Sequence, residues 1–372
     1  MRVEIADIFR RHGPEYREKY GKRMLPSHLK AMEDIERCRT EALGGQLYCC
    51  EHCGDSHYSY HSCKNRHCPK CQNDQAEAWL ENQKSLLLPV PHFMVTFTLP
   101  EELRALARSH QQTLYNLLFR ASAEALQELA ADPRFIGGRI GMTGVLHTWT
   151  RDLHYHPHVH YIVPGGGLSA EGTWLPSRPE FLVHVKPLSV LFRAKVRAQL
   201  QKTDLFPLVN EQVWNKDWVV HCEPVGCGEA AFRYLAPYIL RVALSNNRIL
   251  RLEEGKVTFQ YKESATEQIK CSTVGAEEFI RRFLQHVLPD RFVKVRYYGL
   301  LSPGHRPLLT QARQLLGASA IETTTAAQPR EVKAALGVPR CPKCGSVLIL
   351  VEILRPQRGL KAATPPTGRW PP

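Results

Sequence analysis

The sequence predicts an α+β fold in which helices pack on a mainly antiparallel sheet. Residues 93–99 are almost continuously apolar, which is typical of a strand covered on both faces. Residues 158–163 form a second expected strand, and residues 141–149 could pair with it in the antiparallel sense. Residues 248–253 and 256–261 predict a hairpin about a Glu-Gly turn. Because helices and strands alternate irregularly and hairpins recur, an antiparallel sheet is favoured over a doubly wound parallel one.

Helices are expected around these strands. Pro100 followed by two glutamates is typical of a helix start, since proline suits the first helical position and carboxylates suit the first turn. Leucines and alanines at helical spacing predict a long helix over 111–131. The remaining expected elements are helices at 189–202, 228–244 and 277–287 and strands at 218–222 and 292–298.

The composition divides the chain into six expected segments. They are a basic helical entry segment at 1–46, a zinc-binding module with a connecting helix at 47–90, the main domain at 91–305, a linker at 306–340, a short Cys-pair unit at 341–354 and a disordered tail at 355–372. Ala, Thr, Pro and Ser dominate the linker, and the tail is rich in proline.

The charge of the chain indicates a polyanionic partner. The chain has 372 residues and a formal net charge of +13, which favours nucleic acid, although a merely basic surface is the alternative. We expect no membrane contact and a cytoplasmic location, because the N-terminus is charged and no run of about 18 apolar residues occurs. Association with the nucleoid would follow from binding nucleic acid. In such a reducing compartment the 12 cysteines are not expected to form disulfides.

A cysteine-rich stretch predicts a structural zinc site. Cys50-x2-Cys53 and Cys68-x2-Cys71 are separated by 14 residues, close to the two-knuckle spacing of tetrahedral Zn²⁺. Spare ligands leave a permuted set or a second ion open, and these alternates are Cys49, Cys63 and His67.

The surroundings of this module suggest contact with DNA. Lys64 and Arg66 make the module basic, and Tyr58 and Tyr60 could stack on bases. A further Cys-x2-Cys pair at 341–344 is half of a metal site. Its partners could be Cys222 and Cys227 or a second chain, and a stray pair is equally compatible with the sequence.

The segment His158-Val159-His160 predicts a second metal site. Alternate side chains of a strand share a face, so these two imidazoles would stand about 6.6 Å apart along it and could close on one ion. With 17 histidines in the chain, such a pattern also arises by chance. Pro157 is expected to open the strand, which would place His156 just before it.

Two tyrosines add a possible nucleophile. Tyr234 and Tyr238 are four residues apart and would share one helix face, where aromatic pairs usually belong to the core. A covalent route would use both motifs: a tyrosine attacks a backbone phosphate while a metal on the histidines offsets the developing charge. Pro237 should bend this helix, so the register of the pair is less secure than its spacing suggests.

Taken in order, these motifs resemble the HUH two-tyrosine transposases of rolling-circle bacterial insertion sequences. The likeness covers residues 38–305: the Cys-rich module, the histidine strand, the Tyr234-Leu-Ala-Pro-Tyr238 segment and a Val-Arg-Tyr-Tyr-Gly stretch at 295–299. The resemblance implies an HUH nuclease core, Mg²⁺ or Mn²⁺ on His158, His160 and a third ligand, and a tyrosine that cuts single-stranded DNA. It also implies a 5′-phosphotyrosine and a free 3′-hydroxyl as products, at the element's ends and then in target DNA.

Several assignments remain open at this point. The third ligand could be His147 or His156, with His154 less favoured. Phosphate contacts are expected from arginines on or near the tyrosine helix, namely Arg233, Arg241 and Arg248. A plasmid replication initiator or relaxase would use the same site, and a zinc-containing DNA-binding protein without catalysis is the alternative of another class. A homo-oligomer is compatible with all of these.

Overall fold

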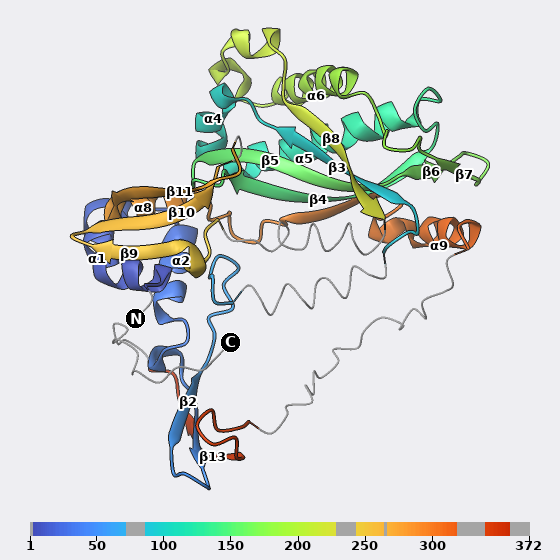
Figure 1. Ribbon diagram of the computed structural model, residues 1–372. Helices are drawn as coiled ribbons and strands as arrows, with labels where there is room; N and C mark the ends of the chain where they lie inside the picture. Colours follow the sequence, from blue (N-terminus) through green and yellow to red (C-terminus); the bar gives the residue numbers. More distant parts are fainter. Residues whose placement is uncertain (1–2, 72–85, 228–242, 264–265, 318–338, 358–372) are drawn as a thin grey trace.

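A seven-stranded antiparallel sheet organises the main domain of the computed structural model, which describes residues 3–71, 86–227, 243–263, 266–317 and 339–357 (Figure 1). The strand order is β7-β6-β4-β5-β3-β8, and β12 pairs with β4. The strands are β3 (Pro91–Thr98), β4 (Arg139–Trp149), β5 (Tyr155–Pro164), β6 (Gly166–Leu168), β7 (Trp174–Pro176), β8 (Val220–Cys227) and β12 (Val295–Gly299). The expected α+β fold on an antiparallel sheet is confirmed.

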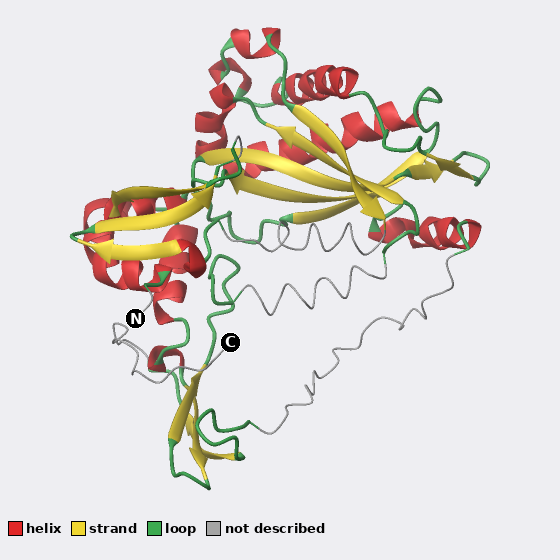
Figure 2. Ribbon diagram, in the orientation of Figure 1, coloured by secondary structure: helices red, strands yellow, loops and turns green. Residues whose placement is uncertain are grey.

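Helices α4 (Arg104–Ser109), α5 (Gln111–Ala131) and α6 (Val185–Leu200) cover one face of this sheet (Figure 2). The main core lies between them, where Phe97 of β3 meets the edge of the Phe192 ring at 5.0 Å between centroids. Because side chains alternate along a strand, residues such as Val159 of β5 enter this core. The histidines of the same strand therefore face the opposite side of the sheet.

A second unit joins the N-terminus to the residues that follow position 248. Strands β9 (Ile249–Glu253), β10 (Lys256–Lys262) and β11 (Ile269–Gly275) form a sheet in the order β11-β10-β9. Helices α1 (Ile5–Tyr20), α2 (Pro26–Arg37) and α8 (Ala276–Leu284) share one apolar core with it. Phe9 and Phe283 meet edge to face at 5.3 Å, so the entry segment packs as part of the fold.

A third, small sheet joins two distant parts of the chain. Its order is β13-β1-β2, with β1 (Gly45–Cys50), β2 (Ser56–Tyr60) and β13 (Leu348–Leu354). Figure 1 shows it projecting away from the rest of the chain. Helix α9 (Arg306–Leu315) occupies part of the expected linker, because Leu309 and Ala312 bury an apolar face beside β6.

The short 3-10 helices complete the described elements. They are η1 (Gly21–Arg23), η2 (Glu41–Leu43), η3 (Glu101–Leu103), η4 (Phe206–Leu208), η5 (Glu211–Asn215), η6 (Asn246–Arg248) and η7 (Pro303–His305). Two expected helices lie largely outside the described residues. They are the connecting helix of the zinc-binding module and the helix over 228–244. Among the residues that are described, no helix has the length and apolar character of a membrane span.

Strand β5 begins earlier than the sequence predicted. It starts at Tyr155, so His156 lies within the strand and not before it. The β4–β5 pairing shifts register between His147 and Trp149, opposite Pro157. A bulge leaves a residue without a regular ladder partner, which accommodates a proline that has no N–H to donate.

Candidate functional site

Three histidines converge on the face of the central sheet opposite helices α5 and α6. His147 of β4 is the register partner of His158 of β5, and His160 is two residues further along β5. Their ligand nitrogens all lie within 4.8 Å of one another. The ring centroids are 4.7 to 5.5 Å apart. Such a cluster fits three imidazole ligands to one metal ion.

Hydrogen bonds orient two of these rings. The Nδ1 atom of His158 donates to the carbonyl oxygen of His156 at 2.6 Å, because a carbonyl can only accept. The Nδ1 atom of His160 lies 2.8 Å from the hydroxyl of Thr96 in β3, which can accept in the same way. A proton on Nδ1 leaves the lone pair of Nε2 for a metal. The carbonyl thus holds His158 in the tautomer that metal binding requires, and the Thr96 hydroxyl orients the ring of His160.

Burial favours the neutral form of His158 and His160. Desolvation lowers the pKa of His160 to about 4, and it lowers the pKa of His158 well below the ordinary value, with a further contribution from His160. His147 is only 3% exposed. Neutral imidazole is the form that binds a cation, so this site can bind metal well below neutral pH.

The other two histidines considered as ligands are engaged elsewhere. The guanidinium of Arg104 donates to Nδ1 of His156 at 2.9 Å. His154 is exposed and lies 2.8 Å from a carboxylate oxygen of Asp152. Of the three candidates for third ligand, the structure brings only His147 into the cluster with His158 and His160.

The ring of Trp149 packs against His147, and the buried amine of Lys294 packs in turn against Trp149. The ring of Trp149 stacks on His147 with centroids 4.9 Å apart, and the Nζ atom of Lys294 lies 5.1 Å from the Trp149 centroid. Desolvation, assisted by the charge of Arg66, lowers the pKa of Lys294 to about 7. Neither Thr96 nor Trp149 was predicted as part of the site. Pairing the strand 93–99 with 158–163 would have placed Thr96 opposite His160.

The expected nucleophiles lie outside the described residues, namely Tyr234 and Tyr238, and so do Arg233 and Arg241. Arg248 is described, and its guanidinium donates to the backbone carbonyls of Gln260, at 2.7 Å, and of Arg151. These bonds tie the start of β9 to β10 and to the turn before β5. Arg248 therefore braces the backbone here, which argues against the predicted phosphate contact.

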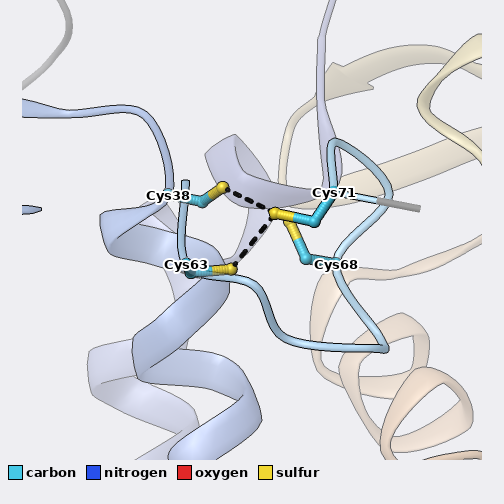
Figure 3. A group of neighbouring side chains, drawn as sticks. All are labelled: Cys38, Cys63, Cys68 and Cys71. Carbon is cyan, nitrogen blue, oxygen red and sulfur yellow. Dashed lines mark hydrogen bonds between the residues drawn. The ribbon is translucent and has the colours of Figure 1, made fainter. Parts of the chain in front are cut away.

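Four cysteines form a metal-binding cluster at the base of the β1–β2 hairpin (Figure 3). They are Cys38, Cys63, Cys68 and Cys71, with the Sγ atom of Cys71 at 3.5 Å from that of Cys38 and 3.6 Å from that of Cys63. Hydrogen bonds from the neighbouring thiols, Cys38 first, lower the pKa of Cys71, so a thiolate is available to a metal. This donor set fits structural Zn²⁺.

The four cysteines predicted as one zinc site are divided between two clusters. Cys50 and Cys53 lie at the tip of the β1–β2 hairpin, whereas Cys68 and Cys71 lie at its base. A strand of six residues spans about 20 Å, so tip and base cannot share an ion. Cys63, an expected alternate, completes the base cluster with Cys38, which no spacing pattern pointed to. Cys341 and Cys344 join Cys50 and Cys53, not Cys222 and Cys227.

The loop between Cys63 and Cys68 docks on the main domain. Arg66 donates to the carbonyl oxygens of Phe292 at 2.5 Å and of Pro289 at 2.7 Å, and burial lowers its pKa. Nε2 of His67 accepts from the N–H of Leu288 at 3.3 Å. His67 is therefore not a ligand of the base cluster, and Arg66 contacts protein where DNA contact was predicted. Lys64 is exposed on the same loop.

Two protein-family models match different parts of this chain. The family model described as "Putative transposase" (Y2_Tnp) matches residues 141–307, which include the histidine cluster. The model described as "Transposase zinc-binding domain" (Zn_Tnp_IS91) matches residues 8–99, which include the base cluster of cysteines.

Relatives and solved structures were also compared. The chain is 40% identical to "Putative transposase y4qJ" of Sinorhizobium fredii (strain NBRC 101917 / NGR234), over 94% of this chain and 95% of that protein. It is 29% identical to the transposase for insertion sequence element IS801 of Pseudomonas savastanoi pv. phaseolicola, over 71% and 68%. Two structures of the conjugative relaxase TrwC with DNA align at 13% identity over 60% of this chain and 73% of theirs, with TM-scores of 0.26 and 0.24. The chain belongs to the rolling-circle insertion-sequence transposases of the two-tyrosine family, with an N-terminal zinc-binding domain.

Proposed function

We propose that this transposase cuts and rejoins single-stranded DNA at the ends of its element, using a divalent cation at His147, His158 and His160 and a tyrosine nucleophile. The observation that supports it most is the convergence of three imidazoles, two of them with Nδ1 held by hydrogen bonds. A cluster of three histidines apart from the cysteine sites favours an enzyme over a DNA-binding protein without catalysis.

The donor set fits the proposed ion. Three imidazoles leave further positions for water and phosphate oxygens, which Mg²⁺ and Mn²⁺ prefer. Imidazole itself suits transition ions, so between these two the site favours Mn²⁺. When bound, the cation would polarise a non-bridging phosphate oxygen. The chain's own residues hold the imidazoles neutral, oriented and partly shielded from water.

The tyrosines would supply the covalent step. The phenol oxygen of Tyr234 or Tyr238 gives up its proton to solvent and attacks the phosphorus, the bond from phosphorus to the 3′-oxygen breaks, and a proton from solvent completes the 3′-hydroxyl. Rejoining reverses this, because a 3′-hydroxyl attacks the 5′-phosphotyrosine and releases the phenol. One phosphodiester is exchanged for another, so no nucleotide hydrolysis is needed. Two tyrosines would allow one strand to remain attached while a second is cut.

The partners of this reaction belong to the same proposal. Single-stranded element ends and target DNA are the expected substrates, and the net charge of +13 would favour their binding. Tyr58 and Tyr60 of β2 stack at 5.8 Å, and Tyr58 is 44% exposed, which offers an aromatic platform for a base. A cytoplasmic location and a homo-oligomer remain part of the proposal.

A covalent-adduct assay tests the enzyme assignment. The full chain is incubated with a labelled single-stranded element end and Mn²⁺, and the adduct is measured on a denaturing gel. We expect an adduct with the wild type and none with the double variant Tyr234→Phe, Tyr238→Phe. An adduct that persists in the double variant, or that never forms with the cognate end, would contradict the proposed nucleophiles.

Paired histidine variants test the metal site. His147→Ala should abolish the adduct and Mn²⁺ binding, whereas His156→Ala should retain Mn²⁺ binding, because its imidazole contacts Arg104 and lies outside the cluster. If His156→Ala loses Mn²⁺ and His147→Ala does not, the third ligand has been assigned wrongly.

A further inference from the structure

The tip of the β1–β2 hairpin and the segment before β13 form two knuckles of the same geometry. Their sequences are Cys-Glu-His-Cys-Gly at 50–54 and Cys-Pro-Lys-Cys-Gly at 341–345. The glycine that follows each pair has a positive φ, 69° at Gly54 and 77° at Gly345, a conformation that glycine adopts without strain.

The hydrogen bonds of the two knuckles correspond one to one. The glycine N–H donates to the carbonyl of the first cysteine in each, at 2.9 Å in the first knuckle and 2.8 Å in the second. The N–H of that cysteine donates to the residue after the glycine, at 3.0 Å for Cys50 to Asp55 and 2.7 Å for Cys341 to Ser346. Two segments almost 300 residues apart therefore present paired thiols from the same tight turn.

The four sulfur atoms lie at the spacing of a tetrahedral site. The Sγ distances are 3.4 Å for Cys50 to Cys344, 3.6 Å for Cys53 to Cys341 and 3.7 Å for Cys53 to Cys344. Sulfurs at about 2.3 Å from one Zn²⁺ would be about 3.8 Å apart. A disulfide would require about 2.05 Å, so these are thiols arranged around a common centre.

The surroundings favour bound metal. Nε2 of His57 lies 3.4 Å from Sγ of Cys341 and can donate to a thiolate there.

Packing alone gives this sheet little stability. Three buried residues form its apolar cluster, namely Cys50, Cys341 and Leu348. On β13, Val351 is 60% exposed and Ile353 is 67% exposed. A sheet with so small a core usually needs a metal or a disulfide to fold.

We propose that Cys50, Cys53, Cys341 and Cys344 bind a second structural Zn²⁺, distinct from the ion at Cys38, Cys63, Cys68 and Cys71. The ion completes a zinc ribbon assembled from two distant parts of the chain, with the sheet β13-β1-β2 as its body. The zinc-binding family model ends at residue 99 and so contains only one of the two knuckles. The ion would fasten β13 to β1 along the register from Cys50–Leu348 to Gly45–Leu354.

Zinc stoichiometry tests the proposal. The purified full chain should contain two zinc ions per molecule, and the double variant Cys341→Ser, Cys344→Ser should contain one. The matched control is Cys271→Ser, whose thiol is exposed on β11 and should leave the zinc content at two. The proposal is overturned if the double variant retains two ions, or if the wild type binds a single ion that this variant keeps.

Thiol protection gives a second readout that needs no variant. In the zinc-loaded wild type, Cys341 and Cys344 should react with an alkylating reagent at least tenfold more slowly than exposed Cys271. A zinc chelator should abolish this protection together with that of Cys50 and Cys53. If Cys341 and Cys344 react as fast as Cys271 before chelation, no metal is bound there, whatever the double variant does to folding.

Discussion

Replacing Thr96 by valine should weaken cation binding without removing a ligand. The Thr96 hydroxyl is 2.8 Å from Nδ1 of His160, and Thr96 is the register partner of His160 across β3 and β5. Valine keeps the shape and the strand preference of threonine but has no hydroxyl to form a hydrogen bond with Nδ1. His160 then loses the hydroxyl contact that orients its ring.

The expected loss is about tenfold in Mn²⁺ affinity. A neutral hydrogen bond contributes about 0.5–1.5 kcal/mol, which corresponds to roughly 2- to 13-fold. Loss of a partner that orients a metal-bound histidine lowers affinity by about 10- to 100-fold. The two ranges overlap near tenfold, or about 1.4 kcal/mol.

Calorimetric titration of Mn²⁺ into the zinc-loaded full chain measures this effect. Thr98→Val is the matched control, since Thr98 lies on the same face of β3 and the described hydrogen bonds include none from its side chain to the cluster. We expect Thr98→Val to bind within about twofold of the wild type. If Thr96→Val also binds within twofold while His160→Ala does not bind, the hydrogen bond does not orient the ligand and the reasoning is wrong.

Three further predictions concern stability. Burial lowers the pKa of His92 to about 4 and of His286 to about 3, so the unfolded chain binds more protons below its histidine pKa of about 6.5. The free energy of unfolding in urea should therefore fall by about 2 kcal/mol per histidine between pH 6.5 and 4.5, and a flat profile would contradict this. Arg66→Ala should lower the urea midpoint by the equivalent of about 2–3 kcal/mol, because two partly buried carbonyls lose a charged donor. Unchanged stability together with weaker DNA binding would instead support the predicted DNA contact. Tyr161→Phe should cost about 1–2 kcal/mol, since its buried hydroxyl donates to the Phe119 carbonyl at 3.0 Å, and it should leave Mn²⁺ affinity unchanged because Tyr161 faces the other side of the sheet.

The histidine pair could be predicted because its geometry is local. A strand repeats every second residue, so His158 and His160 share a face wherever the strand lies. The third ligand was narrowed to a few candidates, since pairing 141–149 with this strand placed His147 nearby. The register that sets His147 opposite His158 depends on the bulge at Pro157, and no local pattern fixed that bulge.

The division of the cysteines could not be predicted. Spacing identifies a knuckle but not its partner, and the entropy of closing a loop grows only slowly with its length. By this relation, pairing with cysteines 288 residues away costs about 2.7 kcal/mol more than pairing with cysteines 14 residues away, which packing of the sheet can offset. The β1–β2 hairpin decides the outcome because it carries Cys50 to its tip and returns Cys63 to its base. The carbonyl partners of Arg66 could not be predicted for a related reason, since a charge in a basic stretch does not show which groups its guanidinium contacts.

A series of contacts leads from the cysteine cluster at the hairpin base to His147, the proposed third ligand. Its loop holds residues 288–292 through Arg66 and His67, and the chain then enters β12, which pairs with β4. Just before that segment, His286 meets the ring of Trp149 at 5.9 Å, and Trp149 stacks on His147. His158 and His160 lie on β5, which is paired on one side with β4 and on the other with β3. A disturbance of the base cluster should therefore displace His147 before the other two ligands, so the zinc-binding domain contributes to the geometry of the proposed cation site.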